Sequence, residues 1–203
     1  MIECTLDYGS VSADGQKLKL VCHGIGTFDV VTGMYAFEND PHCSDRTNAP
    51  IPVGTYYIVE REAGSLRNRF NNWSLETYRN IIKGITNEKS NWFSLISAKT
   101  LSNSITVNGH ERGGLKLHPL NSDGSGYSDG CVTLYSYNEY LSLRREILKQ
   151  STSMLNLRNG SSVKCYGTIR VIGNPDSFNC SVNVDSTGTI TSRNVSKAKG
   201  SYR

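Results

Sequence analysis

Short runs of alternating hydrophobic and polar residues, separated by turn residues, dominate the chain. Three runs, at 53–60, 104–107 and 163–171, are rich in the β-branched and aromatic residues that strands favour. Glycine, asparagine, serine and aspartate interrupt the sequence often, as they do where short strands are joined by turns. The pattern therefore predicts a mainly β fold.

The run at 104–107 leads into Asn108 and Gly109, a dipeptide typical of tight hairpin turns. We expect the returning strand at 115–118, where apolar residues resume. The intervening stretch, 110–114, is longer than a minimal hairpin loop, so the sequence predicts a bulge or loop there.

One helix is indicated over 137–150. Ser136 and Glu139 have the spacing of a capping box, in which each side chain satisfies a backbone N–H at the helix start. A second helical pattern over 74–93 is interrupted at Gly84. The apolar residues at helical spacing in the first segment are Tyr140, Leu143 and Ile147.

Composition narrows the possible functions. The 203 residues, 37% of them hydrophobic, suit one domain with a substantial core. The net charge of +4 is too small and too scattered for a nucleic-acid-binding face, although it permits weak attraction to an anionic bacterial envelope. No apolar run approaches the ~20 residues of a membrane span, and the N-terminus lacks the basic and apolar regions of a secretory signal.

Six cysteines are spread along the chain without a C-x-x-C pair, which argues against a zinc ribbon, an iron–sulfur site or a redox dithiol. The pairs Cys22–His23 and His42–Cys43 resemble metal ligands only weakly, because adjacent side chains diverge. We expect no metal and no cofactor, and favour a buried pair or a disulfide between Cys22 and Cys43. The cysteines are Cys4, Cys22, Cys43, Cys131, Cys165 and Cys180.

The most specific motif in the sequence is a histidine and a cysteine separated by a short loop. The predicted strand ends at His118, a Gly/Ser-rich loop follows, and Cys131 begins the next apolar run. An imidazole of pKa about 6.5 can activate a neighbouring thiol as a nucleophile. Gly130 permits close backbone approach and leaves the N–H groups of Gly130 and Cys131 free to stabilise an oxyanion. An ordinary Ser-Asp-Gly turn with a buried core thiol has the same pattern, and spacing alone leaves both open.

Segments 112–119 and 128–134 together resemble the L,D-transpeptidase signature, a His followed at a distance by Ser-His-Gly-Cys. They are more similar still to small L,D-transpeptidase-related effectors that bacteria inject into rivals through the type VI secretion system. The Pro-Ile-Pro-x-Gly-x-Tyr element of those effectors is matched at 50–56, and the chain's opening segments also fit. The resemblance covers 1–172 and implies an L,D-transpeptidase-like β-sandwich, a β-rich α+β fold with one clear helix after the catalytic cysteine. The Ser/Thr/Asn-rich remainder, 173–203, reads as a partly disordered extension.

The resemblance implies a role for each matched position. Cys131 is the nucleophile and His118 its base, while Gly130 and Cys131 supply the oxyanion N–H groups. Ser128 occupies the hydroxyl position that braces the loop. Asp129 stands where typical members have a second histidine, and it can hydrogen-bond the loop, meet the amine of a diaminopimelate residue or remain a solvated turn residue.

The chain also differs from typical L,D-transpeptidases in the residues after Cys131 and in the shorter interval between the histidine and the cysteine. Both differences fit the small secreted effectors better than the enzymes that cross-link the cell wall. Arg112 has a guanidinium suited to a substrate carboxylate, and Tyr127 can cover the stem peptide or simply pack. We expect His110 to be a surface residue.

The implied reaction begins with Cys131 attacking the L-centre residue, usually meso-diaminopimelate, of a peptidoglycan tetrapeptide stem. D-Ala leaves, and water or another D-amino acid resolves the thioester, so the enzyme is an L,D-carboxypeptidase, an L,D-transpeptidase or both. Expected partners are the stem peptides, a cognate immunity protein and a secretion-system component. The protein would be made in the bacterial cytoplasm and act in the periplasm of target cells.

Two other functions remain open. A cysteine amidase or endopeptidase of the NlpC/P60 type is disfavoured because such enzymes place the cysteine before the histidine. A non-catalytic, β-rich wall-binding module would make Cys131 structural. If Cys131 is a reactive thiol, five cysteines remain, so at most two disulfides form among them and at least one more thiol stays free.

Overall fold

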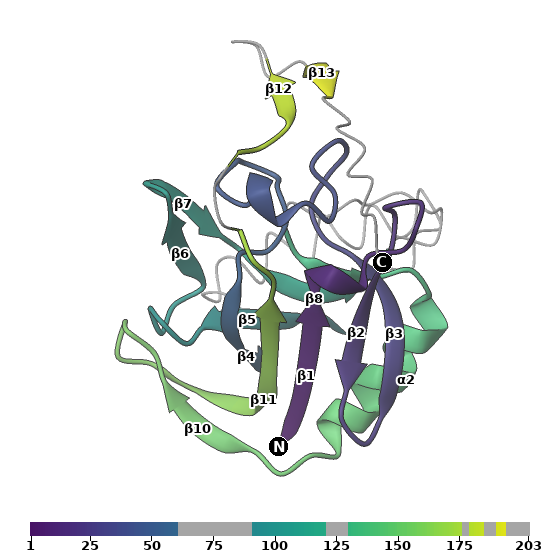
Figure 1. Ribbon diagram of the computed structural model, residues 1–203. Helices are drawn as coiled ribbons and strands as arrows, with labels where there is room; N and C mark the ends of the chain where they lie inside the picture. The colour runs from purple at the N-terminus through teal and green to yellow at the C-terminus, as the bar shows by residue number, and fades with distance from the viewer. Residues whose placement is uncertain (61–90, 121–129, 176–178, 185–189, 194–203) are drawn as a thin grey trace, which may run out of the picture.

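The computed structural model describes residues 1–60, 91–120, 130–175, 179–184 and 190–193. Strands dominate these ranges, with one α-helix and two short 3-10 helices, so the predicted β-rich class is confirmed (Figure 1). The helices are η1 (Tyr8–Ser10), η2 (Pro41–Cys43) and α2 (Tyr137–Leu148). The strands are β1 (Ile2–Asp7), β2 (Leu18–Cys22), β3 (Gly26–Val31), β4 (Gly54–Glu60), β5 (Phe93–Ser97), β6 (Ser104–Val107), β7 (His110–Gly113), β8 (Lys116–Pro119), β9 (Val132–Leu134), β10 (Ser153–Asn156), β11 (Ser162–Ile172), β12 (Val182–Val184) and β13 (Ile190–Arg193).

One sheet closes on itself. Its strand order is β1-β2-β3-β9-β8-β5-β4-β11-β10, and β1 also pairs with β11. The long β11 therefore pairs with β4 on one side and with β1 on the other, which joins eight strands into a barrel-like ring with β10 outside it. The two layers of the expected sandwich are thus parts of one continuous sheet.

Alternating side chains fill the inside of this ring. Strand β1 has the burial pattern expected of a strand with one face in the core, since every second residue is buried. Each fully buried leucine or isoleucine contributes roughly 1.5–3 kcal/mol relative to exposure. The interior includes Leu6, Leu18, Leu20, Ile58, Leu95, Leu117, Leu134 and Ile169, all 0% exposed.

Helix α2 confirms the helix expected over 137–150, although it ends two residues earlier. The side chain of Ser136 accepts a hydrogen bond from the backbone N–H of Glu139, as the capping box predicts. The apolar face packs into the main core through Tyr140, Leu143 and Ile147. The helical pattern over 74–93 lies outside the described residues as far as residue 90, and Phe93 begins β5.

The expected position of the returning hairpin strand is wrong. Asn108 and Gly109 both have positive φ angles, 47° and 81°, as a two-residue type I′ turn requires. The chain therefore returns at once as β7, which pairs with β6. The segment assigned to the return is β8, which lies between β5 and β9 in the main sheet. Its buried Leu117 explains why this segment belongs to the core.

Two disulfides join Cys4 to Cys22 and Cys43 to Cys180, so the expected Cys22–Cys43 bridge is wrong. Cys4 and Cys22 face each other in the register of β1 and β2, which accounts for their pairing. The limit of two disulfides is confirmed. The second bridge ties the C-terminal segment to η2, whereas the division of the chain at residue 172 stays a prediction.

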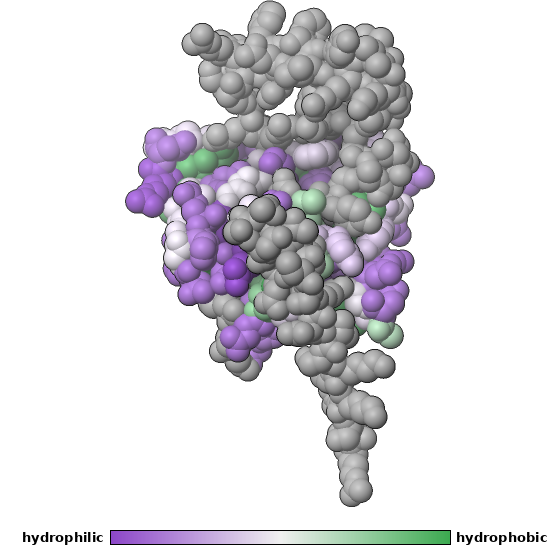
Figure 2. All heavy atoms as spheres, turned by 90° about the horizontal axis from the view of Figure 1, so that it is seen from above, coloured by the Kyte–Doolittle hydropathy of each residue, from purple (hydrophilic) through white to green (hydrophobic). Residues whose placement is uncertain are grey.

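Figure 2 shows a face on which the described residues are mainly hydrophilic, with a few separate hydrophobic areas. Within the described ranges, no helix is both long and apolar enough to cross a membrane.

Candidate active site

Parallel strands β8 and β9 bring the candidate histidine and cysteine to neighbouring positions. Their register pairs Leu117 with Val132 and His118 with Thr133. Cys131 directly precedes β9, two residues before Thr133. Side chains two residues apart on an extended chain share a face of the sheet. Cys131 therefore lies on the same side of the sheet as His118.

The imidazole of His118 is held on three sides. Its Nδ1 lies 2.8 Å from the carbonyl oxygen of Pro119, and since a carbonyl only accepts, Nδ1 carries the proton of that bond. Its Nε2 lies 3.3 Å from the hydroxyl of Thr133. Trp92 stacks on the ring with centroids 4.2 Å apart. This arrangement fixes the ring with Nε2 as the basic nitrogen of the neutral form.

Cys131 is buried, with 7% of the residue exposed. Its Sγ lies 3.8 Å from the carbonyl oxygen of Gly114. The ammonium of Lys116 donates to that same oxygen at 2.7 Å. A cationic neighbour favours the thiolate over the thiol. Cys131 thus lies beside a positive charge, directly before the strand that pairs with the strand of the buried imidazole.

Gly130 is required by close packing as well as by its backbone angle. Its φ is 102°, a conformation that residues with a Cβ rarely adopt. A Cβ built there would lie 2.3 Å from the guanidinium of Arg112 and 2.7 Å from the carbonyl oxygen of Ala49. Both distances are too short for real atoms, so only glycine fits before Cys131.

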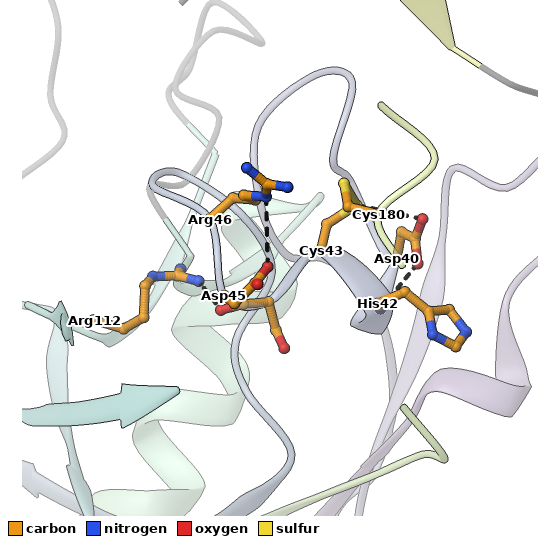
Figure 3. Close-up of a disulfide and its surroundings, with 8 residues drawn as sticks. Asp40, His42, Cys43, Asp45, Arg46, Arg112 and Cys180 are labelled. Atoms are coloured by element: carbon orange, nitrogen blue, oxygen red, sulfur yellow. Dashed lines mark hydrogen bonds and ion pairs between the residues drawn. A yellow bond between two sulfur atoms is a disulfide. The ribbon is translucent and has the colours of Figure 1, made fainter. Parts of the chain in front are cut away.

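Arg112 does not face open solvent, where we expected it to receive a substrate carboxylate. It is 4% exposed and donates hydrogen bonds to the backbone carbonyls of Ser44, Ala49 and Pro50. Figure 3 shows its side chain directed at this segment, with the guanidinium beside Asp45. The guanidinium therefore holds the loop that packs behind Gly130.

Burial lowers the pKa of the Arg112 guanidinium. Negative charge on Tyr8, Tyr56, Cys131 or Asp45 opposes that shift, in this order of importance. The electrostatic interaction is mutual, so the cation of Arg112 in turn favours negative charge on the Cys131 sulfur.

The Pro-Ile-Pro segment, 50–52, has a structural explanation. Proline lacks a backbone N–H, so this stretch cannot pair like an ordinary strand, and its carbonyls need other donors. The hydroxyl of Tyr8 donates to Ile51 at 2.5 Å, and that of Tyr56 donates to Pro52 at 2.7 Å. Burial raises the pKa of both tyrosines, which keeps them protonated donors.

The hydrogen bonds donated to the backbone carbonyls around Pro50 are the part of the site that the sequence did not predict. The available signal was a pair of prolines, both without a donor, followed by a tyrosine four residues after the second one. Nothing in the sequence linked that segment to Arg112, more than sixty residues later.

The other candidates lie elsewhere. Tyr127, Ser128 and Asp129 fall in 121–129, outside the described residues, so their roles stay predictions. His110 is exposed on β7, as expected. Cys22 and Cys43 are in different disulfides, which excludes the metal-like pairing considered for them. Across the part of the chain that the structure describes, no group of three or more His, Cys, Asp or Glu could hold a metal ion.

A family model described as the Tlde1 domain matches residues 26–157. This range includes the Pro-Ile-Pro segment, His118 and Cys131. It excludes β1 and β11, the two strands whose pairing completes the ring. No curated protein and no solved structure matches the chain.

Proposed function

Because the chain belongs to the Tlde1-domain family of type VI secretion effectors, we propose that it is a cysteine enzyme that removes or exchanges the terminal D-Ala of peptidoglycan stems. Family membership supports an antibacterial effector directed at the cell wall. The observation that carries the finer assignment is the fixed imidazole of His118 on the strand beside Cys131.

The proposed first step is acylation of the enzyme. The thiol of Cys131 gives its proton to Nε2 of His118, and the sulfur attacks the carbonyl carbon of the L-centre residue of a tetrapeptide stem. The oxyanion takes hydrogen bonds from the backbone N–H groups of Gly130 and Cys131. The C–N bond to D-Ala then breaks, and His118 returns the proton to the departing amine. A thioester on Cys131 remains.

The second step releases the product. Water gives up a proton to His118 and attacks the thioester, which yields a tripeptide carboxylate and the free thiol. When the amine of another D-amino acid attacks instead, a new peptide bond replaces the old one. Both outcomes consume the tetrapeptide donors that wall cross-linking needs.

The alternative of a non-catalytic wall-binding module remains testable by thiol chemistry. A structural cysteine needs neither a base on the adjacent strand nor a cation at its acceptor oxygen. Iodoacetamide at neutral pH, with peptide mapping, should label Cys131 faster than the other free thiol, Cys165. That second thiol is a built-in control, because burial raises the pKa of Cys165.

The decisive experiment incubates the protein with purified tetrapeptide muropeptides and identifies the products by mass spectrometry. Wild type should release D-Ala, whereas Cys131→Ser and His118→Ala should not. Cys165→Ala is the matched control, since it removes the other free cysteine and should retain activity. Intact stems with the wild-type protein, or cleavage at another amide bond, would refute the proposal.

Delivery and location follow from the same premise. The family supports secretion and action in target cells. Since the proposed substrate is the cell wall, we propose that the protein acts in the periplasm of the target cell. A producing cell would then need an immunity protein that covers the site around Cys131, and a component of the secretion system would carry the effector.

A further inference from the structure

A cavity of about 490 Å³ lies on the outer face of the sheet, on the side that carries Lys116. Such a volume falls in the range of sites for small ligands, roughly 300–1,000 Å³. Val59 pairs with Ser94, and Ser94 pairs with Lys116, so these three lining residues form one row across β4, β5 and β8. The next strand in the sheet is β9, which Cys131 directly precedes. The row therefore leads from the cavity to the cysteine.

The floor of the cavity is apolar and well supported. Val59, Ile96 and Leu157 line it and belong to a buried cluster on this outer face, separate from the interior of the ring. Buried apolar walls exclude water and strengthen any electrostatic interaction made at the rim. The floor suits an aliphatic or methyl side chain.

The charged residues that line the cavity are both cations. Lys116 lies at the end next to Cys131, and Arg158 lies beside Leu157. None of the ion pairs formed by described residues involves either side chain. The ammonium of Lys116 has three N–H groups, one of which donates to Gly114. The lining therefore presents positive charge without an acidic counterpart among the described residues.

One polar atom of the lining lacks a partner. The side-chain oxygen Oδ1 of Asn103 is buried and accepts no hydrogen bond from the described residues. A buried acceptor without a donor costs roughly 1–3 kcal/mol. A ligand that brings an N–H group would remove that cost.

We propose that this cavity binds the carboxylate-bearing part of the stem peptide, with Lys116 taking the carboxylate nearest the attacked carbonyl. Arg158 takes a second, more distant carboxylate, and Asn103 accepts an N–H of the peptide. This inference rests on the proposed function, because it assigns the substrate's acidic groups to the surface beside Cys131. The enzyme would then select its substrate by the free carboxylate at the end of the stem peptide as well as by the D-configured residue.

The test compares a stem tetrapeptide that ends in a free carboxylate with the same peptide ending in a carboxamide. Wild type should process the amide with a KM about tenfold higher. Lys116→Met should raise KM for the free acid by a similar factor and leave KM for the amide unchanged, while loss of the charge beside the thiol lowers kcat for both peptides equally. Lys164→Met is the matched control, since it removes an exposed strand lysine that does not line the cavity.

A parallel reaction with iodoacetamide separates binding from thiol activation, because this reagent is uncharged. Because Lys116 lies beside the thiol, its loss should slow alkylation as well, and only KM reports its role in binding. If Lys116→Met lowers alkylation and kcat but leaves KM for the free acid unchanged, Lys116 acts on the thiol alone and the proposal is wrong. Equal KM values for acid and amide in the wild type would also overturn it.

Failure of the proposed function is distinguishable. If the wild-type protein leaves stems intact, calorimetry with Cys131→Ala still measures binding of the two peptides. Tighter binding of the free acid that is lost in Lys116→Met, together with weaker binding of both peptides in Arg158→Ala, would support the cavity assignment by itself. Equal or absent binding of both peptides would refute it.

Discussion

Replacing Gly130 by alanine tests the close packing behind the candidate nucleophile. The added Cβ meets two obstacles: a backbone φ of 102° and atoms of Arg112 and Ala49 at 2.3 and 2.7 Å. The unfavourable backbone conformation costs about 1–2 kcal/mol. Overpacking adds about 1–3 kcal/mol, because the guanidinium and the carbonyl are fixed by their own hydrogen bonds. The free energy of unfolding should therefore fall by about 2–5 kcal/mol.

Gly160→Ala is the matched control. Gly160 has a φ of 83°, but a Cβ there meets nothing within 4 Å. This variant should lose only the backbone contribution, about 1–2 kcal/mol. For a protein of this size, 1 kcal/mol corresponds to about 2–4 °C in Tm. The expected decreases in Tm are therefore about 4–20 °C for Gly130→Ala and about 2–8 °C for Gly160→Ala.

Thermal unfolding measures these shifts, and site-resolved alkylation of Cys131 gives a second readout. Relief of the clash must move the backbone next to the thiol, so alkylation and turnover of Gly130→Ala should fall by about 10–100-fold, while Gly160→Ala retains both. Equal stability losses in the two variants, together with wild-type alkylation, would refute the packing argument.

Three other changes have expected outcomes. Arg112→Met should lower the free energy of unfolding by about 3–6 kcal/mol, because at least two buried carbonyls lose a charged donor, and it should move Cys131 alkylation to higher pH. Unchanged denaturant and pH profiles would contradict this. Thr133→Val should slow turnover about fivefold without unfolding the protein, since it removes only the hydroxyl beside His118, worth about 1 kcal/mol. Cys43→Ser should cost about 2–5 kcal/mol in urea unfolding under oxidising conditions, and no change would mean that its disulfide is not stabilising.

Features set by local patterns could be predicted from the sequence. The capping box identified the start of α2, and β-branched runs identified β4, β6 and β11. The hairpin turn was also recognised, but its returning strand was placed five residues late. The reason is that apolar residues mark a strand in the core, whereas β7 is polar and pairs with only one neighbouring strand.

Features set by distant contacts could not be predicted. Closure of the ring depends on β1 pairing with β11, strands separated by most of the chain. The disulfide partners depend on other pairings, since Cys4 and Cys22 meet in the register of β1 and β2, and Cys43 and Cys180 are 137 residues apart in the sequence. The prediction that Arg112 binds a substrate carboxylate rests on the shape of its guanidinium, whereas the structure shows it donating to backbone carbonyls of another segment.

The two free cysteines show why their surroundings, more than their number, point to chemistry. Both thiols are buried, and both belong to the same sheet region, since Cys131 directly precedes β9 and Cys165 lies within β11. Cys165 lies in an apolar cluster, where burial raises its pKa and keeps it protonated. Cys131 shares an acceptor oxygen with an ammonium, interacts electrostatically with a buried guanidinium and lies beside the strand of His118. Only a thiolate is a good nucleophile, so the charges around a thiol decide whether it reacts. One fold can therefore hold an inert thiol and a reactive one.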